Sequence, residues 1–170
     1  IRGELFENKS IIRKHNQVIY SSNPDRGLYI LQDMWKEITE RVEGIELIIT
    51  YGWEGLSTWS SDPAWLNKIE NDKRRIETWA KDAGNINLTG RLTKDKLANR
   101  FLSSSLCVYP NNFWETFCLT ALESQAAGVP MITTKLRALS TTLDNDSNIL
   151  IEDNPFGESY KREFIEAVVT

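Results

Sequence analysis

The chain has 170 residues, a length at which one domain with an ordinary hydrophobic core is the default. Apolar residues make up 41% of it, and a net charge of -4 gives no electrostatic case for binding nucleic acid. No apolar stretch approaches the roughly 20 residues that cross a bilayer, so we expect no transmembrane segment and a cytoplasmic location. The two cysteines are expected to be reduced thiols, and no Cys/His set predicts a metal site.

The first half of the sequence predicts two strands, each followed by a helix. A β-branched and aromatic run predicts a strand over 17–21, which ends in the turn-rich sequence Ser-Ser-Asn-Pro-Asp. Apolar residues then recur at helical spacing up to Gly44, at Leu28, Leu31, Trp35, Ile38 and Val42. A second strand is predicted over 46–51 and a loop over 52–62. The following helix, over 63–83, is expected to turn inward Trp65, Ile69, Ile76, Trp79 and Ala83.

The second half continues this alternation of strands and helices. Short apolar runs predict strands over 86–88, 106–109, 131–134 and 148–151. Helical patterns predict helices over 94–102, 116–128 and 156–170. About six such alternations predict an α/β fold, with a Rossmann-like doubly wound parallel sheet and helices on both faces. We expect residues 17–170 to form this domain and residues 1–16 to lead in from a missing N-terminal domain.

Polar residues follow several of the predicted strands directly. Ser21, Ser22 and Arg26 follow the first strand, Arg91 follows the third, and the segment 115–120 follows the fourth. In a doubly wound sheet, ligands bind beyond the carboxyl ends of the strands, near the point where the strand order reverses. These residues are therefore the candidates for a common site.

The predicted helix over 116–128 combines an anion-binding end with polar side chains. A helix N-terminus presents free N–H groups and a positive dipole end, which suit phosphate oxygens. Thr116, Thr120 and Glu123 are expected to share one face of the helix behind that end. The opposite, packing face is expected to consist of Leu119, Leu122 and Ala126. A phosphate and a polyhydroxylated group could be bound together there.

The segment Glu115-Thr-Phe-Cys-Leu-Thr-Ala-Leu-Glu123, followed by Ala126-Ala-Gly-Val-Pro-Met-Ile, resembles a known signature. It is similar to the E-x7-E motif of family-4-type retaining glycosyltransferases of the GT-B fold, in their C-terminal, donor-binding domain. Other segments resemble that domain in the same order. They are Val18-Ile-Tyr-Ser-Ser with Arg26-Gly-Leu, the strand from Ile45 to Tyr51, and Asn87-Leu-Thr-Gly-Arg-Leu with Leu97. The resemblance covers roughly residues 17–170.

The resemblance implies roles for three charged residues. Glu123 corresponds to the carboxylate that accepts hydrogen bonds from the ribose diol of the nucleotide. Glu115 corresponds to the carboxylate that binds hydroxyls of the donor sugar near its anomeric centre. Arg26 stands where the family has a lysine that neutralises the diphosphate leaving group. Each has an ordinary alternative, because Glu123 could be a solvated helix carboxylate, and Glu115 and Arg26 could be surface charges near helix ends.

The resemblance also implies a set of further donor-binding residues. Backbone amides at the start of the helix would contact sugar or phosphate, and Thr120 would offer its hydroxyl to phosphate. Arg91 would lie where the chain passes the nucleobase and would contact the base through its backbone. Alternatively, Arg91 could be an ordinary charged residue of a loop. The complete set, apart from the three charged residues above, is Ser22, Arg91, Thr116, Phe117, Cys118, Leu119 and Thr120.

Two positions depart from the family pattern. Ser22 stands near the place of the first basic residue of the diphosphate clamp, and losing that cation would weaken the clamp by about 1–3 kcal/mol. Cys118 replaces a common glycine, which would cause strain if the backbone there were left-handed. Cys118 could alternatively be a nucleophile at a helix end, although no base is apparent nearby.

The family implies that a nucleoside-diphosphate sugar binds this domain, that an acceptor binds a missing N-terminal domain, and that the sugar transfers with retention. Neither a metal nor another cofactor is expected, because Arg26 and the helix end can neutralise the diphosphate. One rival function is a nucleotide-sugar sensor without activity. Another is a flavodoxin- or receiver-like domain, which would need acids after its first strand, where this chain has Ser-Ser-Asn. The aromatic residues Trp53, Trp59, Phe113 and Trp114 either face an acceptor or a subunit, or pack under loops.

Overall fold

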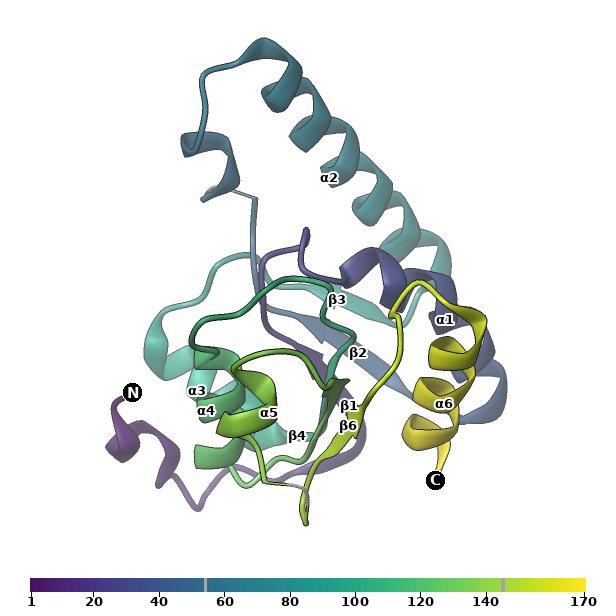
Figure 1. Ribbon diagram of the computed structural model, residues 1–170. Helices are drawn as coiled ribbons and strands as arrows, with labels where there is room; N and C mark the ends of the chain where they lie inside the picture. Colours follow the sequence, from purple (N-terminus) through teal and green to yellow (C-terminus); the bar gives the residue numbers. More distant parts are fainter. Residues whose placement is uncertain (54, 145) are drawn as a thin grey trace.

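A parallel β-sheet with helices on both faces forms the centre of the computed structural model, which describes residues 1–53, 55–144 and 146–170 (Figure 1). In chain order its strands are β1 (Lys14–Tyr20), β2 (Glu46–Ile49), β3 (Ile86–Leu88), β4 (Ser104–Tyr109), β5 (Met131–Thr134) and β6 (Ile149–Ile151). Their order in the sheet is β3-β2-β1-β4-β5-β6, and neighbours run parallel. This order confirms the predicted doubly wound fold. It differs from the 2-1-3-4-5 order of a flavodoxin or receiver domain, which excludes that rival.

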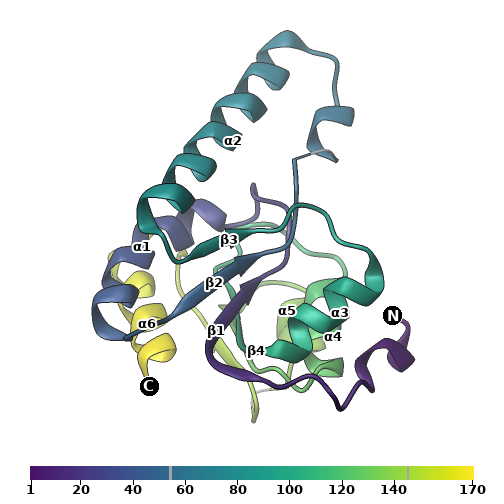
Figure 2. The same ribbon diagram turned by 180° about the vertical axis from the view of Figure 1, so that it is seen from behind.

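The helices divide between the two faces of the sheet. In chain order they are η1 (Gly3–Phe6, 3-10), α1 (Leu28–Arg41), η2 (Leu56–Thr58, 3-10), α2 (Pro63–Ala83), α3 (Lys94–Ser103), α4 (Leu119–Ala126), α5 (Leu139–Thr142) and α6 (Glu158–Val169). Helices α1 and α6 pack together on one side, and α3, α4 and α5 lie on the other, as the two opposite views show (Figures 1 and 2). None of the helices within the described residues has the length and hydrophobicity to cross a membrane.

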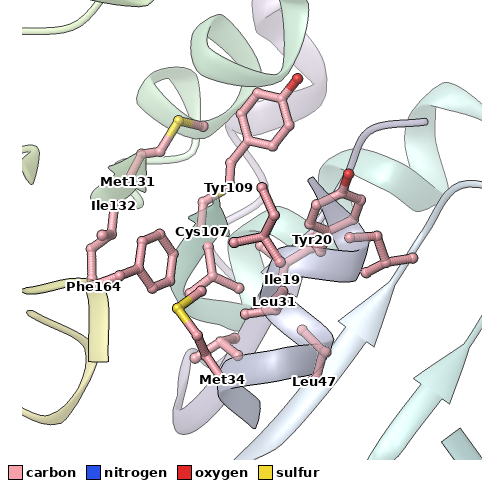
Figure 3. Packing of buried hydrophobic residues seen from close by; sticks show 14 of the residues in the cluster. Ile19, Tyr20, Leu31, Met34, Leu47, Cys107, Tyr109, Met131, Ile132 and Phe164 are labelled. Atoms are coloured by element: carbon pink, nitrogen blue, oxygen red, sulfur yellow. The ribbon is translucent and has the colours of Figure 1, made fainter. Parts of the chain in front are cut away.

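The core lies on both sides of the central strands, as the uninterrupted apolar runs predict. Ile19, Leu47 and Val108 are buried on β1, β2 and β4. Residues of α1 and α6, including Met34 and Phe164, cover one face of the sheet (Figure 3). Strands buried on both faces are typical of parallel sheets, because the crossover helices cover both faces.

Helix α2 follows its predicted inward face only in part. Ile69 and Ile76 are buried, whereas Trp65 and Trp79 are half-buried and Ala83 is exposed. The N-terminal part of the helix projects beyond the sheet, beside the segment that carries η2 (Figures 1 and 2). The segment 52–62, which was predicted to be a loop, contains the short helix η2. Residue 54 of this segment lies outside the described residues.

Strand β1 begins three residues before the predicted start, at Lys14. The preceding residue, Arg13, donates from its guanidinium to the carbonyl oxygens of Ala127 (2.6 Å) and Gly128 (2.7 Å) at the end of α4. The last carbonyls of a helix lack partners within it and favour a cation, so this contact satisfies them. It also ties the start of β1 to α4. The four-residue helix α5 had no counterpart in the sequence prediction.

Helix α4 begins at Leu119 and not at Thr116 as predicted. In the preceding loop the side chain of the buried Asn111 accepts from the N–H of Phe113 (2.9 Å) and donates to its carbonyl (2.7 Å), and the backbone of the N-cap residue Cys118 is extended. The predicted packing face is also wrong, because Leu119 is 48% exposed and Ala126 is exposed. The buried side chains are small or polar instead: Thr120, Ala121, Glu123 and Ser124.

Gly27 permits a close backbone approach between the turn after β1 and the turn after β4. Its φ is +105°, and a Cβ on it would lie 2.0 Å from the carbonyl oxygen of Pro110. The turn after β1 therefore lies directly against the turn after β4. Only glycine readily adopts a left-handed backbone and also lacks the Cβ for which there is no room here.

Replacing Gly27 by alanine should lower the free energy of unfolding by about 3 kcal/mol or more, because backbone strain adds to a clash with backbone atoms. Urea unfolding of the purified chain measures this loss. Gly84→Ala is the matched control, since Gly84 has a φ of +71° but open space around the added methyl group. It should cost only about 1 kcal/mol. Equal losses in the two variants would show that the contact with Pro110 is unimportant.

Candidate functional site

A cleft of about 260 Å³ opens at the carboxyl ends of β1, β2 and β4. Strands β1 and β4 are neighbours, and their crossovers run in opposite directions from this point, so the cleft lies at the topological switch of the sheet. It is lined by Ser21, Ser22, Asn23, Arg26, Thr50, Tyr51, Arg91, Leu92, Lys94, Leu97, Glu115, Phe117, Cys118, Leu119, Thr120 and Glu123.

The structure brings nine of the ten predicted site residues into this cleft. The tenth, Thr116, is exposed, precedes α4 and does not share the face of Thr120 and Glu123. The late start of α4 explains this, because the expected helical spacing does not extend back to residue 116. The remaining nine residues come from three separate segments, which follow β1, β3 and β4 and meet only in the folded chain.

Glu115 is 6% exposed and accepts two hydrogen bonds on the same carboxylate oxygen. Arg26 donates to Oε1 from Nη1 at 3.0 Å, and the hydroxyl of Tyr109 donates to Oε1 at 2.7 Å. The backbone is fixed as well, because the carbonyl of Glu115 accepts from the N–H of Ala138 at 3.2 Å. A buried carboxylate that is held in this way has a defined orientation at the cleft.

Arg26 is held between Glu115 and an aromatic ring. Its guanidinium lies 4.2 Å from the ring centroid of Phe113, in a cation–π arrangement. Burial disfavours the charged guanidinium, but Glu115, Tyr109 and Asp25 together favour it, so the pKa of Arg26 stands above its ordinary value. The cation therefore stays charged at the edge of the cleft.

Glu123 also lines the cleft and is only 7% exposed. Among the described residues, its carboxylate has no hydrogen-bond or salt-bridge partner. Burial raises its pKa above the ordinary value, and the positive charge of Lys94 opposes this effect in part. A buried carboxylate without a donor is costly, so the site holds an acceptor group that a ligand could satisfy.

The start of α4 borders the cleft between the two carboxylates. Residues 117–120 line it, so the N–H groups of the first helical turn lie beside it. The hydroxyl of Thr120, predicted to contact phosphate, donates to the carbonyl of Ser21. In this arrangement Thr120 fastens α4 to the end of β1, and its oxygen remains available as an acceptor only.

Cys118 fits its position at the N-cap of α4 without strain. Its φ of -92° and ψ of 99° are those of ordinary extended backbone, so the position does not require the glycine that is common in the family. Burial raises the pKa of its thiol to about 11, which keeps the sulfur protonated near neutral pH. This opposes the alternative in which Cys118 is a nucleophile.

Comparison with known proteins shows the family of the chain. The family model described as glycosyl transferases group 1 matches residues 18–169. The chain belongs to the group 1 glycosyltransferases. The resemblance to the C-terminal domain of GT-B glycosyltransferases is thereby confirmed.

Individual relatives of this glycosyltransferase chain are distant in sequence. It is 24% identical over 121 residues to a lipopolysaccharide 1,2-N-acetylglucosaminetransferase of Salmonella typhimurium, covering 69% of this chain and 29% of the relative. The pneumococcal O-GlcNAc transferase GtfA, solved with UDP and GlcNAc, matches 93% of this chain at a TM-score of 0.67 and 16% identity. Anabaena Alr3699/HepE, solved with UDP-glucose, matches 92% at a TM-score of 0.65 and 14% identity.

The chain spans only part of these proteins. It covers 29% of the Salmonella transferase, 29% of GtfA and 39% of HepE. At these identities the structural matches establish the fold and leave the choice of substrate open.

Several residues of the cleft were missed by the sequence analysis, above all Thr50, Tyr51 and Lys94. Thr50 and Tyr51 follow β2 directly, so the rule that ligands bind beyond the carboxyl ends of strands would have found them. Lys94 begins α3 and has no such signal. The four aromatic residues left open differ: Trp53 is half-buried, whereas Trp59, Phe113 and Trp114 are 56%, 42% and 66% exposed.

The side chains within residues 1–53, 55–144 and 146–170 form no group of three or more His, Cys, Asp or Glu that could hold a metal ion. The sole histidine, His15, lies on β1 and is exposed, away from the cleft.

Replacing Glu123 by glutamine should stabilise the empty protein at neutral pH. The folded state raises the pKa of Glu123, so it binds more protons than the unfolded state. The wild type therefore loses stability as the pH rises from the ordinary carboxyl pKa through the folded pKa. Thermal unfolding between pH 4 and pH 8 should show a higher unfolding temperature for the variant than for the wild type, and this difference should widen with pH.

Glu166→Gln is the control, because the folded state shifts the pKa of Glu166 in the opposite direction. The hydrogen bond from Arg41 lowers the pKa of Glu166, so this carboxylate stabilises the folded state once it is ionised. The substitution should leave the protein no more stable than the wild type at any pH in the series. If Glu123→Gln gave a gap that did not change with pH, the buried charge of Glu123 would not be its cause.

Proposed function

We propose that this chain is the donor-binding half of a retaining glycosyltransferase that transfers a sugar from a nucleoside-diphosphate sugar to an acceptor. The observation that carries the proposal is the single cleft that holds Glu115, Arg26, the start of α4 and Glu123 together. Relatives of the same fold were solved with UDP and GlcNAc or with UDP-glucose, which supports a nucleotide-sugar donor. The acceptor would bind the N-terminal domain of the complete enzyme, and this half would bind the donor without catalysing transfer.

The parts of a nucleotide sugar match the parts of the cleft. Glu123 would accept hydrogen bonds from the two ribose hydroxyls, which supply the donors that its buried carboxylate lacks. The N–H groups at the start of α4 would bind the diphosphate. The backbone around Arg91 would contact the base. Glu115 would bind hydroxyls of the sugar close to its anomeric carbon.

In the transfer step, the bond between the anomeric carbon and the diphosphate oxygen would break, and a bond to an acceptor hydroxyl oxygen would form on the same face of the sugar. The proton of that hydroxyl would pass to the departing diphosphate. The negative charge that develops on the diphosphate would be stabilised by Arg26 and by the dipole of α4. This supply of positive charge is why we propose a reaction that needs no metal ion and no further cofactor. The two free, buried thiols support our proposal of a cytoplasmic enzyme.

A sensor that binds the donor without transferring it remains the second candidate. Ser22 supplies no cation where the family has one, and its hydroxyl donates to Tyr109 at 3.3 Å. An incomplete diphosphate clamp would weaken leaving-group stabilisation more than binding. Sugar transfer by the full-length protein would exclude the sensor, and donor binding without turnover would favour it.

A panel of UDP-, GDP- and ADP-linked sugars should contain a ligand that raises the unfolding temperature of this chain, because a ligand that binds only the folded state stabilises it. Glu123→Ala should remove most of that shift by deleting the acceptor for the ribose hydroxyls. Thermal-shift assays and calorimetry measure both effects. Equal shifts in wild type and variant would move the ribose contact elsewhere.

Replacing Arg26 by glutamine should weaken binding of the nucleoside diphosphate selected by that panel by about ten- to hundredfold, as expected for losing a hydrogen bond between charged groups. Arg91→Gln is the matched control, because it removes a cation from the same cleft at an exposed position. It should change the affinity by no more than about threefold. Similar losses in both variants would point to general charge attraction in place of a specific contact by Arg26.

A further inference from the structure

Tyr109 ends β4 directly beneath the cleft and is fully buried. Its ring packs edge-on against Tyr20, the last residue of β1, with 5.9 Å between the ring centroids. The hydroxyl oxygens of both tyrosines point out of the apolar cluster (Figure 3). The Tyr109 hydroxyl donates to Glu115 Oε1 at 2.7 Å and accepts from the hydroxyl of Ser22 at 3.3 Å. The last residue of a core strand is therefore bonded to the carboxylate of the site.

Both donors to Glu115 meet the same oxygen. Oε1 accepts from Tyr109 and from Nη1 of Arg26, whereas Oε2 has no hydrogen-bond partner among the described residues. A carboxylate offers about four acceptor positions over its two oxygens. This arrangement fixes the carboxylate through one oxygen and leaves the other for a ligand.

We propose that Tyr109 is a positioning residue that keeps Glu115 directed into the cleft when Arg26 turns to the diphosphate of the donor. The inference rests on the proposed function, in which Glu115 binds the sugar and Arg26 the diphosphate. In the empty cleft these two residues are paired with each other, so a bound diphosphate competes with Glu115 for the cation. Tyr109 is the partner that remains.

A neutral donor suits this role better than a second cation. Burial raises the pKa of the Tyr109 phenol far above its usual range, so the group keeps its proton. It can then orient the carboxylate without neutralising it, and the negative charge stays available to sugar hydroxyls. Ser22 contributes by donating to the phenol oxygen, which leaves the phenol proton for Glu115. The serine that replaces the expected cation thus belongs to the network that orients Glu115.

Tyr109→Phe tests the proposal through the difference between a nucleotide sugar and its free nucleotide. Calorimetry on this chain would use the pairs UDP and UDP-glucose, GDP and GDP-mannose, and ADP and ADP-glucose. For the pair that the wild type binds, the variant should bind the nucleotide sugar about five- to tenfold more weakly and the free nucleotide within about twofold. Equal weakening of both ligands would overturn the proposal, as would no weakening of either.

Tyr20→Phe is the matched control. It removes a hydroxyl of equal burial that donates to the backbone carbonyl of Asn23 at 2.9 Å and does not contact Glu115. It should leave the ratio of the two affinities within about twofold of the wild type. Thermal unfolding of both variants verifies that each is folded at the temperature of the binding experiment.

A double-mutant cycle with Glu115→Ala separates positioning from a general structural effect, because alanine has no acceptor for the Tyr109 hydroxyl. If Tyr109 acts through the carboxylate, Tyr109→Phe should change the affinity ratio by less than twofold when residue 115 is already alanine. An undiminished effect in that background would overturn the proposal. A wild type that bound none of the six nucleotides would overturn the proposed function itself. A wild type that binds, with a ratio unaltered by Tyr109→Phe, would overturn only this inference.

Discussion

The site depends on the close approach of two turns at the place where β1 and β4 separate. Gly27, after β1, lies so near the carbonyl of Pro110, after β4, that no side chain fits between them. Arg26 directly precedes this glycine, and Glu115 follows Pro110 by five residues, so the same contact brings the cation and the carboxylate within 3.0 Å. The Thr120 hydroxyl bonds the carbonyl of Ser21 and holds α4 against the end of β1. The backbone contact thereby sets the width of the cleft.

The charges of the cleft serve binding more than they serve stability. The ion pair of Arg26 and Glu115 is largely buried, with side chains 23% and 7% exposed, and burial of this kind costs about as much as the attraction returns. The carboxylate of Glu123 is buried without a hydrogen-bond donor from the described residues, and this destabilises the empty protein. The core beneath consists of contiguous apolar strands that tolerate such losses. Strained or uncompensated groups of this kind gather at functional sites, because a ligand completes them.

The sequence predicted those features that local patterns determine. Contiguous apolar runs located all six strands described here, and polar residues after them located most of the cleft. The prediction from sequence failed where the structure depends on a contact with a distant part of the chain or on a contact without a periodic pattern. No periodic signal marks the extended backbone of Cys118, after which α4 begins, or the contact of Arg13, just before β1, with the carbonyls at the end of α4. The buried face of α4 was misjudged because small residues allow a close approach to the sheet. There Ser124 donates to the carbonyl of Val129 at 2.7 Å.

Tyr109 illustrates why a site residue can escape sequence analysis. In the sequence it is one more apolar residue at the end of a buried strand, and its ring does pack in the core. Only the fold places its hydroxyl between Ser22 and Glu115, which lie in separate segments of the chain. This placement also gives a reason for the serine where a cation was expected. A cation at position 22 would lie close to Tyr109, Glu115 and Arg26 together, and would repel Arg26 while it neutralised the carboxylate. With serine there, Arg26 is the cation closest to Glu115, and on the proposed function the N–H groups of α4 carry a larger share of the diphosphate charge.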